Sequence, residues 1–221
     1  MNNFELSNSF VADASSSFKM ICFGLLDAAY VEVYAATIVN SDWDENAISE
    51  VLVSKINNNP FSISRHITAI TEKRILAGNS HVNLSKVDSA YRIDIKIGGF
   101  GWSSTEYRTE YYIEAKNIYC QSFKKTNNTS MTSHSQYIKR YLETGINNIL
   151  NGHYPLDTLL LGYVLVGTVQ EAVALLNGCL KNDSRCTKVI IMKDMKEFPH
   201  LLFGESEHSG GMIVEHCFLP F

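Results

Sequence analysis

Apolar and polar residues alternate most regularly in the middle of the chain. From Tyr91 to Ile97 every second residue is apolar, and the residues between them are charged. The run 107–118 repeats this period of two, so that Glu114 and Lys116 share one face. A glycine-rich segment over 98–105, expected to be a turn, separates the two runs. The pattern predicts an antiparallel hairpin in which Asp94 lies across from Glu114 and Lys116.

Other segments have the spacing of helices or of buried strands. Apolar residues at helical spacing predict helices over 17–40, 43–56, 136–150 and 168–180, the last opened by the capping box Thr168-Val169-Gln170-Glu171. Continuous apolar runs predict buried strands at 159–166 and 189–192, and a last strand at 212–218. Residues 1–17 are expected to be loose, 61–76 extended or mixed, and 121–135 a mobile loop. The order of elements predicts an α/β fold with a mixed central sheet flanked by helices.

The charge of the chain is small overall but unevenly distributed. The 221 residues carry a formal net charge of -4, with 45% hydrophobic and 19% charged residues. The segment from Tyr91 to Arg140 contains eight Lys or Arg and four Asp or Glu, so its net charge is +4 and that of the rest of the chain is -8. A basic segment around a few acids suits a polyanion held near a cation, although a solvated charged face gives the same pattern.

Cysteine usage and the apolar segments bear on the compartment. The five cysteines occur singly and without a C-x-x-C pair, which is typical of reduced thiols in a cytoplasmic protein. The first residues lack the basic and apolar regions of a signal peptide. Asp27 and Glu32 interrupt the apolar run 20–39, which is therefore expected to be a buried helix and not a membrane span.

The pattern acid-x-Lys occurs three times, so the pattern alone is weak. It is found at Asp94-Ile95-Lys96, Glu114-Ala115-Lys116 and Asp194-Met195-Lys196. The third match reads as a strand end followed by a loop. The second ends a predicted strand and has another strand acid twenty residues before it. The second match is therefore the candidate site.

These residues have the chemistry that phosphodiester hydrolysis requires. Mg²⁺ binds one or two carboxylates together with substrate oxygens and waters. Asp94 and Glu114 are the candidate carboxylates, and the backbone carbonyl of Ala115 is a candidate third ligand. Lys116 faces the same way as Glu114, where an ammonium group can orient the attacking water or stabilise the transition state.

The arrangement Asp94...Glu114-Ala115-Lys116 resembles the PD-(D/E)xK nuclease superfamily, which has the restriction-endonuclease-like fold. Arg92-Ile93-Asp94-Ile95 is similar to a form of the motif in which the Pro before the Asp is missing, as it is here. The segment 43–52 resembles the first-helix motif, in which a Glu completes the metal site. Glu45 matches that position best, and Glu50 and Glu72 are the alternatives. The resemblance covers about 43–192 and implies a nuclease-like domain over 41–221, with residues 1–40 as an added N-terminal segment and helix.

The resemblance implies a Mg²⁺-dependent endonuclease, with Mn²⁺ able to substitute, whose site residues are Asp94, Glu114, Lys116 and Glu45. Its substrate is expected to be nucleic acid, with DNA preferred, in restriction or phage defence. Tyr137 and Arg140, on the helix after the motif, are suited to a phosphate contact. A homodimer or a partner subunit is also expected, since cutting both strands of a duplex needs two sites. The alternative function is a non-catalytic subunit that keeps the fold to bind nucleic acid or a protein, and an unrelated small-molecule enzyme is a third.

Overall fold

A computed structural model describes residues 8–74, 92–99, 109–126, 131–155 and 157–221. Its centre is a seven-stranded mixed sheet with the strand order β1-β2-β3-β6-β9-β8-β7. β6 pairs in parallel with β3 and β9, and the other neighbours are antiparallel. The expected α/β class and mixed central sheet are confirmed.

The strands of the sheet run from one end of the chain to the other. They are β1 (Ile67–Arg74), β2 (Arg92–Gly99), β3 (Thr109–Tyr119), β6 (Leu159–Val166), β7 (Cys186–Lys193), β8 (Leu202–His208) and β9 (Met212–Pro220). A separate two-stranded hairpin consists of β4 (Phe123–Lys124) and β5 (Met131–Thr132). The helices are α1 (Asn8–Ala35), α2 (Glu45–Asn58), α3 (Pro60–Ser64), α4 (His134–Arg140), α5 (Asn147–Leu150) and α6 (Val169–Leu180). A π-helical segment, Tyr141–Ile146, joins α4 to α5, and a 3-10 turn, Ser209–Gly211, joins β8 to β9.

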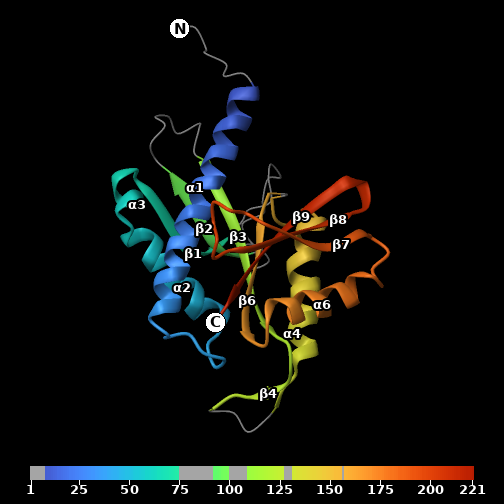
Figure 1. Ribbon diagram of the computed structural model, residues 1–221. Helices are drawn as coiled ribbons and strands as arrows, with labels where there is room; N and C mark the ends of the chain where they lie inside the picture. Colours follow the sequence, from blue (N-terminus) through green and yellow to red (C-terminus); the bar gives the residue numbers. More distant parts are fainter. Residues whose placement is uncertain (1–7, 75–91, 100–108, 127–130, 156) are drawn as a thin grey trace, which may run out of the picture.

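Helices cover both faces of the sheet (Figure 1). α1 and α2 pack on one face, in a core that includes Leu26, Ile48 and Ile113. α4 and α6 pack on the other, against Ile118, Leu160 and Phe218. α1 is therefore part of the main core, while the boundary expected near residue 40 stays a prediction. In the described part of the chain, no helix combines the length and the apolar character that a membrane span needs.

The predicted hairpin and most of the later elements are confirmed. β2 and β3 are antiparallel, although the predicted turn between them lies outside the described residues. The helix after Asp44 begins as expected, because the Asp44 side chain accepts a hydrogen bond from the backbone N–H of Ala47. Both halves of the capping box at Thr168 and Glu171 are present. β6 is buried along nearly its whole length, as its apolar run predicts.

Several expectations were wrong. Residues 8–16 are helical, because Phe10, Val11, Ala14 and Phe18 continue the helical spacing of α1 despite the serines between them. By contrast, α2 ends at Asn58 close to its predicted end, and Pro60 then begins the short helix α3, where a missing N–H costs nothing. The segment expected to be a loop forms the β4–β5 hairpin, and helix α4 begins within it.

The end of the sheet was also misjudged. β8 was not predicted, because its polar residues do not form the apolar pattern expected of a strand. It nevertheless pairs with β9 along its whole length. β7 was expected to be buried but is an edge strand, in which Ile190 is buried and its neighbours are mostly exposed. The helix predicted over 136–150 is confirmed in outline. Its middle, however, widens into a π-helical turn, a feature often found at functional sites.

Candidate functional site

The site begins where β2 and β3 separate. Their pairing runs from Gly99–Thr109 to Ile95–Ile113, which sets Asp94 opposite Glu114. At this point the Asp94 side chain replaces a backbone partner, because its Oδ2 accepts the N–H of Ala115 at 2.7 Å. The other edge of β3 continues in parallel pairing with β6. Asp94 is therefore fixed by the backbone of the strand that carries the other candidate residues.

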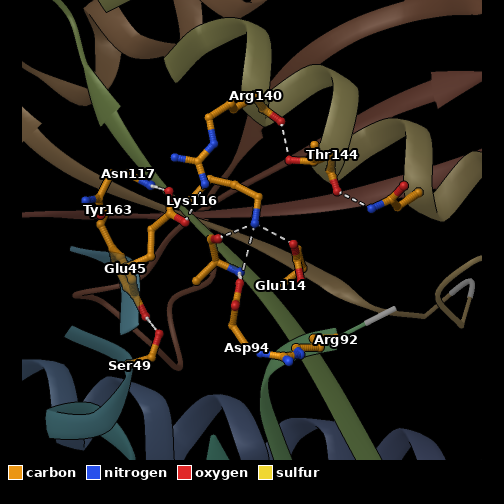
Figure 2. A network of polar contacts seen from close by, with 12 residues as sticks. Glu45, Ser49, Arg92, Asp94, Glu114, Lys116, Asn117, Arg140, Thr144 and Tyr163 are labelled. Carbon is orange, nitrogen blue, oxygen red and sulfur yellow. Dashed lines mark hydrogen bonds and ion pairs between the residues drawn. The ribbon is translucent and has the colours of Figure 1, made fainter. Parts of the chain in front are cut away.

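Lys116 lies among the three oxygens predicted to hold a metal ion (Figure 2). Its Nζ donates to Glu114 Oε1 and to the Ala115 carbonyl oxygen at 2.8 Å, and it lies 3.5 Å from Asp94 Oδ2. Glu114 Oε2 is buried and has no hydrogen-bond partner among the described residues. The three oxygens thus converge on one positive charge, and that charge is the lysine's own ammonium.

Burial dominates the electrostatics of this pair. The side chains of Lys116 and Glu114 are 6% and 4% exposed. Burial raises the pKa of Glu114 to about 8, against the opposing effect of Lys116. Burial favours the neutral amine of Lys116, but the carboxylates of Glu114 and Asp94 outweigh it and raise the pKa of Lys116 above its usual value. Near neutral pH the lysine is therefore the fixed charge, and Glu114 is the group that a stronger cation would deprotonate.

Glu45, in the first turn of α2, lies beside this group. Its Oε1 accepts the backbone N–H of Asn117 at 3.1 Å, and its Oε2 accepts from Arg140 Nη2 at 3.1 Å. The Asn117 side chain holds the segment before α2, because its Nδ2 donates to the carbonyl of Trp43 at 3.0 Å. One residue of β3 therefore fixes Glu45 through its backbone and the approach to α2 through its side chain.

These residues line a polar cleft of about 370 Å³. The residues that line it come from α2 and the turn before it, from β2 and β3, from the segment after β4, and from α4: Asp44, Glu45, Asn46, Asp94, Lys116, Asn117, Lys125, Tyr137 and Arg140. Acids and bases are equal in number among them, so the cleft has no excess of either sign. Glu114 is buried and is not among the described residues that line the cleft.

The structure separates two of the three candidates for the helix glutamate. Glu45 lines the cleft. Glu50 is exposed on α2 and is not among the described residues that line the cleft. Glu72 lies on β1, but its side chain is outside the described part. Of the two candidates whose side chains are described, Glu45 is therefore the one that lines the cleft, and its role in the site stays a prediction.

Of the other residues that line the cleft, some were predicted from the sequence and some were not. Tyr137 and Arg140 were expected to contact phosphate, and both line the cleft. Asn117 and Lys125 were missed. Asn117 follows the motif directly, but a period of two puts it on the opposite side of β3 from Lys116, so it was not considered with the motif. Lys125 was assigned to a loop, and nothing in the local pattern marks its approach to the Asp42 carbonyl at 3.3 Å.

The other two acid-x-Lys matches behave differently. In the first, Lys96 is buried and pairs with Glu110, so its triplet is divided between two ion pairs. In the third, Asp194 and Lys196 are exposed after the end of β7, as the strand-end interpretation predicted.

The donor set is sparse by the standards of a metal centre. Among the described residues, no three His, Cys, Asp or Glu side chains are grouped closely enough to hold one ion. Glu45 does not complete such a group with Asp94 and Glu114. His208 and His216 are buried and joined through the hydroxyl of Ser206.

Comparison of the chain with family models, with curated proteins and with solved structures found no match. The resemblance to the nuclease superfamily therefore rests on Asp94, Glu114, Lys116 and their surroundings alone.

Proposed function

We propose that this chain is a metal-dependent nuclease with a restriction-endonuclease-like fold, which hydrolyses phosphodiester bonds of nucleic acid, with DNA as the expected substrate. One observation carries the proposal. The oxygens of Asp94, Glu114 and Ala115 converge on a single cation position at the bottom of a polar cleft. Lys125 and Arg140 also line this cleft and would contact the phosphates of a bound strand.

The residues fit Mg²⁺ or Mn²⁺, the cofactor that the resemblance implies. Two carboxylates and a backbone carbonyl are the hard oxygen donors that Mg²⁺ takes, with water completing its shell. The unpartnered Glu114 Oε2 supports this assignment, since a buried carboxylate oxygen without a partner is costly. When bound, the ion would supply charge neutralisation and an acidified water.

The chain's own residues have distinct roles in this proposal. Asp94 and Glu114 would hold the metal, and the hydrogen bond from the Ala115 N–H would keep Asp94 in place. Lys116 would leave its carboxylate partners and place its ammonium beside the phosphate, where it orients the attacking water or neutralises developing charge. Glu45 assists from the wall of the cleft, and Arg140 would contact a non-bridging oxygen.

Cleavage of nucleic acid tests the proposal directly. Plasmid, linear duplex, single-stranded DNA and RNA are incubated with the protein in Mg²⁺, Mn²⁺ or EDTA. We expect metal-dependent cleavage that falls by a factor of about 100 or more in Asp94→Asn, Glu114→Gln and Lys116→Ala. The matched controls Asp194→Asn and Lys196→Ala carry the same changes at the exposed triplet and should cleave at the wild-type rate. Cleavage that survives in Lys116→Ala would contradict the assignment.

A second function has an observation of its own in its favour. Lys116 already fills the cation position, and a site neutralised in this way needs no metal. The chain would then be a non-catalytic subunit that binds nucleic acid or a protein partner through the same cleft. Calorimetry with Mn²⁺ separates the two proposals, because heat of binding that Asp94→Ala abolishes is expected only of the nuclease.

A further inference from the structure

An ion pair spans the cleft above the candidate metal ligands. Arg140, at the end of α4, reaches Glu45, in the first turn of α2, with 3.1 Å between Nη2 and Oε2 (Figure 2). The guanidinium carbon also lies 5.8 Å from the centre of the Tyr137 ring. The Arg140 side chain is 52% exposed, whereas Glu45 is 13% exposed. The arginine is thus accessible from solvent while the carboxylate lies deeper.

We propose that this ion pair is a latch that couples metal binding to nucleic-acid binding, an inference that rests on the proposed nuclease function. Without substrate, Arg140 neutralises Glu45 and weakens its attraction for a divalent cation. When a phosphate of the nucleic acid enters, Arg140 pairs with it and releases Glu45. Arg140 is then a positioning residue that acts through Glu45.

The geometry makes the exchange inexpensive. A half-exposed ion pair is worth little, because water and salt screen it. A phosphate offers the guanidinium two acceptor oxygens, whereas Oε2 of Glu45 offers one, since Oε1 already accepts from Asn117. The contact with Tyr137 keeps the guanidinium near the cleft during the exchange. Glu45 itself stays in place, because the backbone N–H of Asn117 still holds it.

The latch acts through charge and needs no movement of Glu45. Release of Glu45 leaves its negative charge unneutralised in the cleft that Asp94 also lines. Linkage then requires that nucleic acid tightens metal binding and that metal tightens nucleic-acid binding by the same factor.

Titration with Mn²⁺ alone, followed by calorimetry, tests the latch on the intact protein. Arg140→Gln should bind Mn²⁺ about three to ten times more tightly than wild type, because the competing charge is gone. The matched control is Lys139→Gln, which removes a charge from the neighbouring exposed ion pair with Glu143 and should not change the affinity. In a Glu45→Gln background, Arg140→Gln should give no further gain.

A short phosphorothioate DNA duplex, which resists cleavage, supplies the second readout. Wild type should bind it more tightly in Mn²⁺ than in EDTA, and Arg140→Gln should lose most of that difference. Equal Mn²⁺ affinities in wild type and Arg140→Gln would overturn the latch and leave the nuclease proposal standing. Mn²⁺ binding by none of the variants would overturn both, so the two failures are distinguishable.

Discussion

Replacing Lys116 with methionine probes the candidate site most directly. The substitution keeps the length of the buried side chain and removes the ammonium from Glu114, Ala115 and Asp94. Above pH 8, where Glu114 is ionised, the substitution breaks a buried ion pair, which costs about 3–5 kcal/mol. For a chain of this size a loss of about 3 kcal/mol lowers the melting temperature by about 6–12 °C. Lys196→Met, at an exposed position, should stay within about 0.5 kcal/mol of wild type.

The loss of stability in Lys116→Met should depend on pH, and the protonation of Glu114 sets the direction of that dependence. Its pKa is raised by burial from 4.5 to about 8, so the folded carboxyl stays protonated over a range in which the unfolded one is ionised. Its contribution to stability is therefore complete below pH 4.5 and is lost as the pH rises through about 8. Methionine at 116 raises this pKa further. The deficit of Lys116→Met should be smallest near pH 6 and widen above pH 8.

Metal should reverse the loss if the oxygens form a metal site. Mn²⁺ at one hundred times its dissociation constant stabilises a protein by about 2.7 kcal/mol. Lys116→Met has no ammonium competing for the oxygens, so it should gain more from Mn²⁺ than wild type does, while remaining inactive. Urea unfolding in Mn²⁺ and in EDTA measures both gains. An equal gain, or none, in the variant would refute the view that Lys116 occupies a metal position.

Three further predictions concern the surrounding fold. Burial, and to a smaller extent His208, lowers the pKa of His216 to about 3. The stability that this neutral histidine contributes above pH 6.5 should therefore fall by about 1.4 kcal/mol per pH unit on acidification. His216→Gln should flatten that slope, measured by urea unfolding at a series of pH values. Gly162→Ala should cost about 1–3 kcal/mol, because its new Cβ would lie 2.6 Å from Ile118 Cδ1; Gly178→Ala, with open space around its Cβ, should instead stabilise by about 0.5–1 kcal/mol. Thr168→Ala should lose about 1 kcal/mol with its capping box, measured by thermal unfolding.

The sequence predicts those features that a local pattern determines. The alternation over β2 and β3 correctly placed Glu114 and Lys116 on one face, because side-chain direction in a strand repeats every two residues. It also placed Asp94 opposite them, since antiparallel pairing follows from the hairpin. Capping residues correctly located the starts of α2 and α6.

Features that depend on distant parts of the chain were not predictable in this way. The hydrogen bond from Asn117 to Trp43 joins residues 74 positions apart. The approach of Arg140 to Glu45 joins residues 95 positions apart and depends on how α4 crosses the end of β3. β8 was missed because its alternation places Glu205 and Glu207 on one face, and ion pairs with β7 stabilise them there.

Two buried lysines on adjacent strands show why the charges at Asp94 and Glu114 call for a functional explanation. Lys96 and Lys116 are equally buried, and each pairs with a glutamate on β3. Buried ion pairs add little net stability compared with apolar residues of similar size, so neither pair is explained by stability alone. Lys116 differs in three respects: it contacts a second carboxylate, it contacts a backbone carbonyl, and it lines the cleft. An ion pair that is purely structural requires none of these, and the proposed cation site rests on all three.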